Sequence, residues 1–112
     1  MKLSVTASAH RDIDRAAAFY ARQQTGLGTQ FIMEVDRMLA VLRHNPWLGQ
    51  RLDKTWRRVH LQKFPYTLIY KSNDRNDSIC ISVVCHQHRR PDYRHNRVEE
   101  PIATYEVTRI AA

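Results

Sequence analysis

The sequence has no long apolar run: none approaches the ~18–20 apolar residues that a helix needs to cross a bilayer. Residues 1–6 also lack the apolar stretch of a secretory signal. We therefore expect a cytoplasmic protein that does not contact a membrane. Internal repeats and low-complexity tracts are missing too. The 112 residues, 43% hydrophobic and 26% charged, are typical of one soluble globular domain.

Cysteine is scarce, and its spacing matches no zinc or redox motif. Cys80 and Cys85 are five residues apart in one expected strand, without a CxxC partner. Because side chains alternate along a strand, this spacing predicts that the two thiols point to opposite faces and cannot form a mutual disulfide. We expect two buried, reduced thiols.

Acidic residues are the minority among the charged ones. The chain has 18 Lys and Arg against 11 Asp and Glu, which gives a net charge of +7 with His neutral. This excess favours an anionic partner, such as nucleic acid, a ribosome or an acidic protein segment, and does not choose among them.

The first 46 residues predict a strand and two helices. Residues 2–7 alternate as a short strand, and Ser8 is a candidate N-cap for a helix with Asp12 and Asp14 near its positive end. The apolar stripe of this helix is Ile13, Ala16, Ala17 and Tyr20. Residues 26–28 (Gly-Leu-Gly) predict a tight reversal.

The second helix has an apolar face and a polar face and should end at Asn45-Pro46. Its apolar face is formed by Phe31, Val35, Met38, Leu39 and Leu42. Its polar face is expected to hold Glu34, Asp36, Arg37 and Arg43. Two amphipathic helices joined by a short turn predict an αα-hairpin.

From residue 56 the apolar period becomes two. Residues 56–63, 66–71 and 79–85 are strand-like, and polar turns separate them. We predict an α+β fold in which the helical hairpin covers one face of a three-stranded antiparallel sheet.

Two stretches carry a family resemblance. Residues 57–70 read RRVHLQKFPYTLIY, a basic pair that leads to Phe-Pro-Tyr and an apolar strand ending in Tyr. A second signature lies within residues 86–97, at His86, Arg89, Pro91, Tyr93 and Arg97. With the order of its elements, the chain resembles the RelE/ParE superfamily of bacterial toxin–antitoxin toxins, in the ParE-like (plasmid stabilisation) branch.

The resemblance covers residues 1–97 as one toxin domain. Residues 98–112 lie outside it as a C-terminal extension, either an added edge strand or a tail that a partner orders. Arg94 stands where these sequences commonly carry Trp.

The resemblance implies a growth-inhibiting toxin of a bacterial type II module, neutralised by a cognate antitoxin through an acidic helical segment. ParE-like members inhibit DNA gyrase by binding, whereas RelE-like members cut mRNA on the ribosome without a metal. The further partner is therefore DNA gyrase or, alternatively, the ribosome with mRNA. A third interpretation is an inactive relic that only binds its antitoxin, which the residue at position 94 favours.

Cleavage of RNA would need cations at the phosphate and groups that transfer protons. The candidate catalytic residues are Arg58, Lys63, His86, Arg89 and Tyr93. The resemblance to RelE-like nucleases implies Tyr-Arg at the start of the central strand, but this chain has Tyr66-Thr67. Losing one preorganised charge costs on the order of 10²–10³ in rate. We therefore favour a binding toxin over an enzyme.

The run of His and Arg after the last expected strand is the candidate surface for the target. Its members are His88, Arg89, Arg90, Tyr93, Arg94 and Arg97. The arginines could instead form a solvated face or pair with Glu99 and Glu100, and the tyrosine could anchor the segment to the helices.

The same run offers a weak zinc pattern. His86 and His88 share one face of an extended segment, and only Asp92 and His95 are nearby further ligands. We therefore predict no metal and no cofactor.

Overall fold

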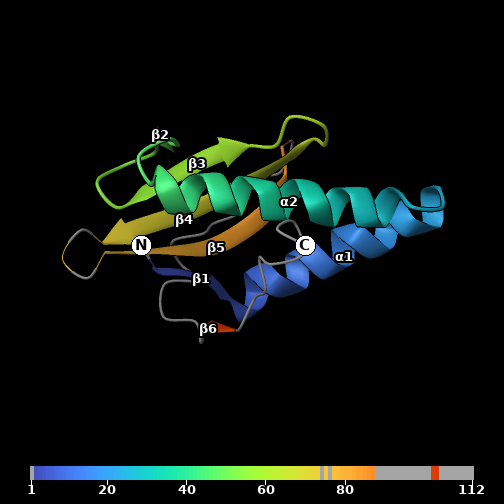
Figure 1. Ribbon diagram of the computed structural model, residues 1–112, viewed down its shortest axis with the longest axis horizontal. Helices are drawn as coiled ribbons and strands as arrows, with labels where there is room; N and C mark the ends of the chain where they lie inside the picture. The colour runs from blue at the N-terminus through green and yellow to red at the C-terminus, as the bar shows by residue number, and fades with distance from the viewer. Residues whose placement is uncertain (1, 74, 76, 88–101, 104–112) are drawn as a thin grey trace.

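Two helices cover one face of a six-stranded sheet in the computed structural model, which describes residues 2–73, 75, 77–87 and 102–103 (Figure 1). The elements are β1 (Lys2–Thr6), α1 (Ala7–Gln23), α2 (Leu27–His44), β2 (Gln50–Arg51), β3 (Trp56–His60), β4 (Tyr66–Asn73), β5 (Ser78–His86) and β6 (Ile102–Ala103). None of the helices in these residues is long and apolar enough to cross a bilayer.

The α+β class and the RelE/ParE-like arrangement expected from the sequence are confirmed. The expected antiparallel strands are β3, β4 and β5, and they form the centre of the order β2-β3-β4-β5-β1-β6. The sheet is larger than expected because β1 adds to β5 in parallel and the two-residue strands β2 and β6 extend its edges.

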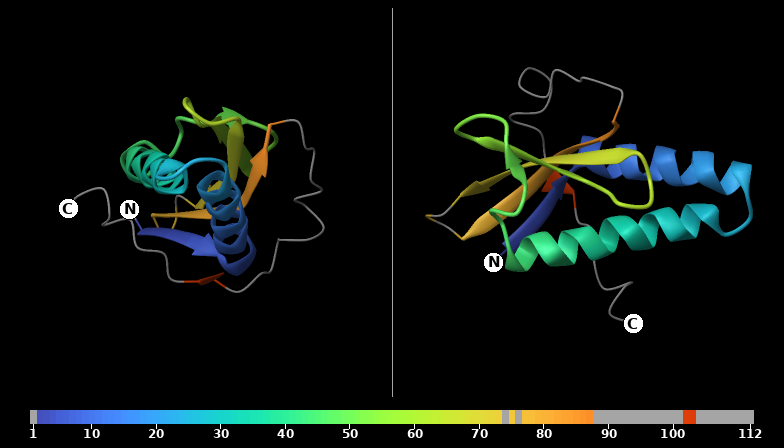
Figure 2. Two further views of the ribbon diagram at one scale, coloured as in Figure 1. Left: turned by 90° about the vertical axis from the view of Figure 1, so that its right-hand side faces the viewer. Right: turned by 90° about the horizontal axis from the view of Figure 1, so that it is seen from above.

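The two helices form the expected hairpin, whose tip extends beyond the sheet (Figure 2). Gly26 makes the reversal with a φ of 85°, a backbone region that favours glycine. Gly28 lets the helices approach, since a Cβ there would lie 2.5 Å from the Ala17 carbonyl oxygen. The two helices are therefore closely packed where α2 begins.

The N-cap prediction was wrong by two residues. Thr6, not Ser8, caps α1: its Oγ1 accepts a hydrogen bond from the Ala9 N–H at 3.2 Å. Helix α1 begins directly after β1, so no acidic residue lies in its first turn. Asp12 is used differently, since its Oδ2 accepts from the Val84 N–H at 3.1 Å and ties α1 to β5 beyond the end of β1.

The main core lies between the hairpin and the sheet. Both expected apolar stripes contribute to it, from Ile13 on α1 to Leu42 on α2. Four aromatic rings meet near the start of β4, with centroids 4.8–6.1 Å apart. They belong to Tyr20, Phe31, Phe64 and Tyr66.

We call the sheet surface turned away from the helices the outer face. The strand register assigns to it Trp56, Arg58 and His60 of β3, Thr67, Ile69 and Lys71 of β4, and Cys80, Val83 and Cys85 of β5. Trp56, Ile69 and Val83 form a second buried cluster on this face.

The prediction that the two thiols point to opposite faces was wrong. Ile69 pairs with Val83 and Tyr70 pairs with Ile81, so Ser82 is an extra residue in β5. This bulge shifts the alternation by one and returns Cys80 and Cys85 to the same face. Both are half-buried rather than buried, and neither forms a disulfide.

Candidate functional site

Near one end of the outer face, Thr67 stands at the position where the resemblance to RelE-like nucleases implies an arginine. Thr67 is the second residue of β4 and lies between His60 of β3 and Cys85 of β5. Its hydroxyl lies 2.6 Å from His60 Nδ1, and its side chain is only 5% exposed. The position is therefore occupied by a compact, neutral hydrogen-bonded group.

Arg58 is the candidate cation that β3 contributes to this face. It lies two residues before His60 on the same strand and face, roughly 7 Å along the chain. Its Nε and Nη2 both donate to Gln50 Oε1, at 3.1 and 2.9 Å. This contact holds the guanidinium toward the sheet edge formed by β2.

Lys63 lies in the turn between β3 and β4, and its side chain is exposed. Helix α2 holds this turn: Glu34 Oε2 accepts from the Gln62 N–H at 3.2 Å and from the Lys63 N–H at 3.0 Å. Arg37 donates to the other carboxylate oxygen of Glu34. The backbone of the turn is thus fixed while the Lys63 side chain extends from it.

The expected polar face of α2 needs a correction, because Glu34 and Asp36 are 5% and 0% exposed. Glu34 lies three residues after Phe31, within the apolar stripe, and is buried because the turn below it presents two backbone donors. The spacing alone could have placed Glu34 in the interface. Arg37 and Arg43 are exposed as expected.

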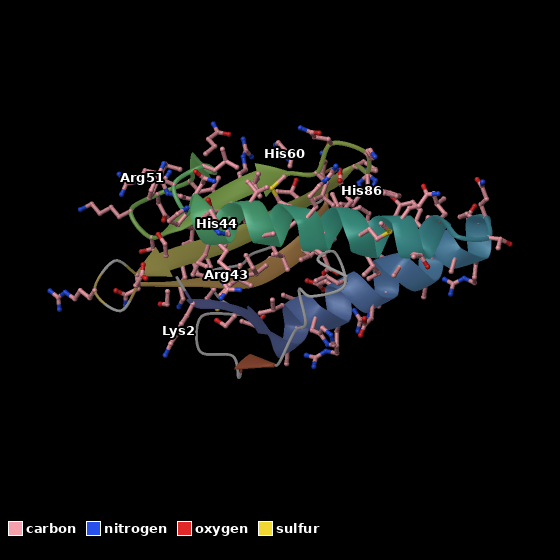
Figure 3. The ribbon with its side chains drawn as sticks, viewed as in Figure 1. Lys2, Arg43, His44, Arg51, His60 and His86 are labelled. Atoms are coloured by element: carbon pink, nitrogen blue, oxygen red, sulfur yellow. The ribbon has the colours of Figure 1, made fainter. Side chains whose placement is uncertain are left out.

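His86 ends β5 opposite Tyr66, and the two rings are 5.5 Å apart with an edge-to-face geometry. Its register places it on the helix side of the sheet, unlike Arg58. His60 and His86 lie at the same end of the sheet (Figure 3). The structure therefore places Arg58, His60 and Thr67 on one face of the sheet and His86 on the other.

The other expected site residues lie outside the described part of the chain. They are His88, Arg89, Arg90, Tyr93, Arg94 and Arg97. Within the described part, no three His, Cys, Asp or Glu side chains are grouped to hold a metal ion.

Sequence reasoning missed the loop between α2 and β2. Its residues Trp47 and Leu48 are 68% and 51% exposed. The fully buried Tyr70 lies beneath it, and burial raises the pKa of its phenol, although the Gly49 N–H and the Arg57 charge oppose this shift. The signal available in the sequence was a Trp next to the proline that ends a helix.

Comparison with known proteins assigns the family. The sequence model described as "ParE toxin of type II toxin-antitoxin system, parDE" matches residues 3–91, which run from β1 past the end of β5. A search of curated proteins gave no match. With a match over most of its length and the architecture expected for these toxins, the chain belongs to the ParE toxin family of type II toxin–antitoxin systems.

Proposed function

We propose that this toxin acts by binding, that its target is DNA gyrase, and that a cognate antitoxin neutralises it in the bacterial cytoplasm. The observation that carries the proposal is that Thr67, hydrogen-bonded to His60 Nδ1, occupies the position of β4 where the resemblance implies a cation. A metal-independent ribonuclease needs preorganised positive charge where charge builds up on the phosphate. The central strand supplies none at this position.

The candidate catalytic residues that the structure describes support binding as well. Arg58 is turned to Gln50, the Lys63 side chain extends from a turn at the sheet end, and His86 belongs to the opposite side of the sheet. General acid–base chemistry requires its groups within hydrogen-bonding reach of one reacting centre. These three residues do not share such a centre in the described structure.

The surface of α2 supports the antitoxin part of the proposal. A hollow of about 210 Å³ is lined by Met33, Arg37 and Lys63, together with Gln30 and Glu34. Met33 is 52% exposed, so an apolar floor lies beside two cations. An acidic amphipathic helix fits this chemistry, because its apolar side chains cover the methionine and its carboxylates face the rim.

Controlled expression in bacteria tests the target. Plasmid supercoiling and mRNA integrity are read from the same cultures, and purified toxin is added to gyrase in vitro. We expect loss of supercoiling with intact mRNA. Codon-phased cuts in translated mRNA would instead establish the ribosome-dependent nuclease. Unchanged DNA and RNA, with antitoxin still bound, would establish the inactive relic.

Two substitutions sharpen this test. Arg58→Ala and Arg89→Ala should each abolish toxicity if the chain cuts RNA. For a binding toxin, each should weaken toxicity only where that side chain contacts the target. Arg22→Ala, at the far tip of the hairpin, removes one positive charge as the matched control.

The antitoxin contact has its own test. Met33→Asp and Arg37→Glu should weaken capture of the co-expressed antitoxin, while Arg22→Glu should not. We also expect the isolated toxin to associate in solution and the complex to stay dispersed. Antitoxin capture that is unchanged by both substitutions on α2 would place the contact elsewhere.

A further inference from the structure

The loop of residues 45–54 exposes an indole that the fold does not use. Trp47 is 68% exposed, whereas the chain's second tryptophan, Trp56, is 5% exposed and packs in the outer cluster. Large exposed aromatic side chains are costly on a soluble protein and are enriched where a partner binds.

This exposure does not come from a loose loop, because its backbone is bonded on both sides of Trp47. The Tyr70 hydroxyl donates to the Pro46 carbonyl at 2.9 Å and accepts from the Gly49 N–H at 2.8 Å. Arg57 Nη1 donates to the Trp47 and Gly49 carbonyls, at 3.2 and 2.8 Å. The indole is therefore held outward by a fixed support.

Positive charge gathers beside the indole. A hollow of about 200 Å³, here called the basic hollow, is lined by Trp47 with Arg51, Lys54 and Arg57, and its walls are mainly polar. Among the described residues, Asp53 is the one acidic residue that lines it, and its Oδ1 accepts the N–H groups of Thr55 and Trp56, at 2.8 Å.

More cationic side chains stand at the same end of the molecule. Arg43 lies in the last turn of α2, at the end of the molecule that also carries Arg51 of β2 (Figure 3). The hairpin tip lies at the opposite end (Figure 1). The positive charge beside the indole therefore extends across the region where α2 ends and β2 begins.

We propose that the basic hollow binds single-stranded nucleic acid, with a base stacked on Trp47 and phosphates held by Arg51 and Lys54. An exposed π face beside cations matches the alternation of bases and phosphates along a strand. An acidic protein segment fits less well, because its apolar side chains need an apolar-walled groove and these walls are polar. Duplex DNA is disfavoured because its bases are already stacked.

The test is the binding of a fluorescein-labelled dodecamer of thymidine to the purified full chain, followed by anisotropy and by tryptophan quenching. Trp56 also lines the hollow, so the Trp47 signal is taken as the difference in quenching between the parent and Trp47→Phe, in which Trp56 alone remains. Trp47→Ala should weaken binding about 5- to 150-fold. Trp47→Phe should retain most of the affinity, while Trp47→Leu, apolar but without a π face, should not.

Salt dependence tests the phosphate contacts. Arg51→Ala with Lys54→Ala should lower the slope of log K against log salt by about 1.4, since each single-strand phosphate contact contributes about 0.7. Arg57 is left in place because it supports the loop. The matched control, Arg15→Ala with Arg22→Ala on α1, removes the same charge away from the hollow and should leave the slope nearly unchanged.

The outcomes separate the alternatives. If the control pair lowered the salt slope as much as Arg51→Ala with Lys54→Ala, the attraction would be diffuse and the proposal would be overturned. Parent-like affinity of Trp47→Leu would overturn it too. Binding of a glutamate-rich peptide in place of the oligonucleotide would identify a protein-binding surface instead. A uridine dodecamer, run in parallel, tells whether the 2′-hydroxyl contributes. The assay contains no gyrase, so its failure leaves the proposed target untouched.

Discussion

Removing the Glu34 carboxylate charge should loosen the turn between β3 and β4 more than it disturbs α2. In Glu34→Gln, one carboxylate oxygen is replaced by an amide NH₂, which cannot accept the bonds that reach it now. The Gln62 and Lys63 N–H groups currently donate to Oε2 at 3.2 and 3.0 Å. Glutamine has one acceptor oxygen, so it can accept from the turn or from Arg37 but not from both. Neither contact then involves a charged acceptor.

The magnitude follows from these contacts. A hydrogen bond to a charged group contributes about 1.5–3 kcal/mol. Because residues 62 and 63 are exposed, water partly replaces the lost acceptor, and we take the lower part of this range. We expect the free energy of unfolding to fall by about 2 kcal/mol, measured by urea unfolding with the m-value unchanged. Hydrogen exchange should quicken first at the amides of Gln62 and Lys63.

Arg37→Gln is the matched control for the salt bridge alone. The Arg37 side chain is 51% exposed, and such pairs contribute about 0–1 kcal/mol. Equal destabilisation by both substitutions would refute the reasoning, because the ion pair and not the backbone contacts would then hold the turn. So would a change in Glu34→Gln below about 0.5 kcal/mol.

Three further predictions concern the loop support and the sheet. Tyr70→Phe should lower the free energy of unfolding by about 1–3 kcal/mol, measured by heat or urea, because the Pro46 carbonyl and the Gly49 N–H lose their hydrogen-bond partner. Because burial raises the Tyr70 pKa, the unfolded chain loses this proton first, near pH 10, so the free energy of unfolding should fall as pH rises above about 10. The phenylalanine variant should show a shallower alkaline fall. Gly49→Ala should cost about 1–3 kcal/mol by overpacking, as its Cβ would lie 2.5 Å from the Tyr70 hydroxyl and 2.7 Å from a backbone oxygen. Asp12→Ala should cost about 1–2 kcal/mol by removing the acceptor of the Val84 N–H, and a variant as stable as the parent would show that water replaces it.

Periodicity was enough to predict most of the fold. The change from helical spacing to alternation near residue 56 predicted the hairpin and β3 to β5, because burying one face of each element requires those periods. The parallel addition of β1 was not predicted. Its pairing with β5 joins residues about 76 positions apart, and nothing local in residues 2–6 specifies that partner.

Two of the errors arise from features that a side-chain period does not contain: an irregular strand pairing and a long-range backbone contact. The Ser82 bulge reversed the predicted faces of Cys80 and Cys85. Glu34 was predicted to be exposed because it is charged, but its carboxylate is buried where it accepts from the Gln62 and Lys63 N–H groups. Single-sequence patterns contain the side-chain period but not these long-range donors. The candidate site was harder still, because the signature within residues 86–97 indicates a family and does not indicate which partner its arginine and histidine residues contact.

The two proposed surfaces lie toward different ends of α2, which bears on how neutralisation works. From Met33 to His44 the helix rises about 16 Å, and Trp47 lies beyond that end. An antitoxin helix that contacts only Met33, Arg37 and Lys63 leaves the basic hollow uncovered. If the antitoxin silences the toxin from that position, it does so by blocking contact with gyrase, and the neutralised complex keeps its capacity for single-stranded nucleic acid. The positive charge of the chain would then serve two partners: the acidic antitoxin on α2, and single-stranded nucleic acid at the basic hollow.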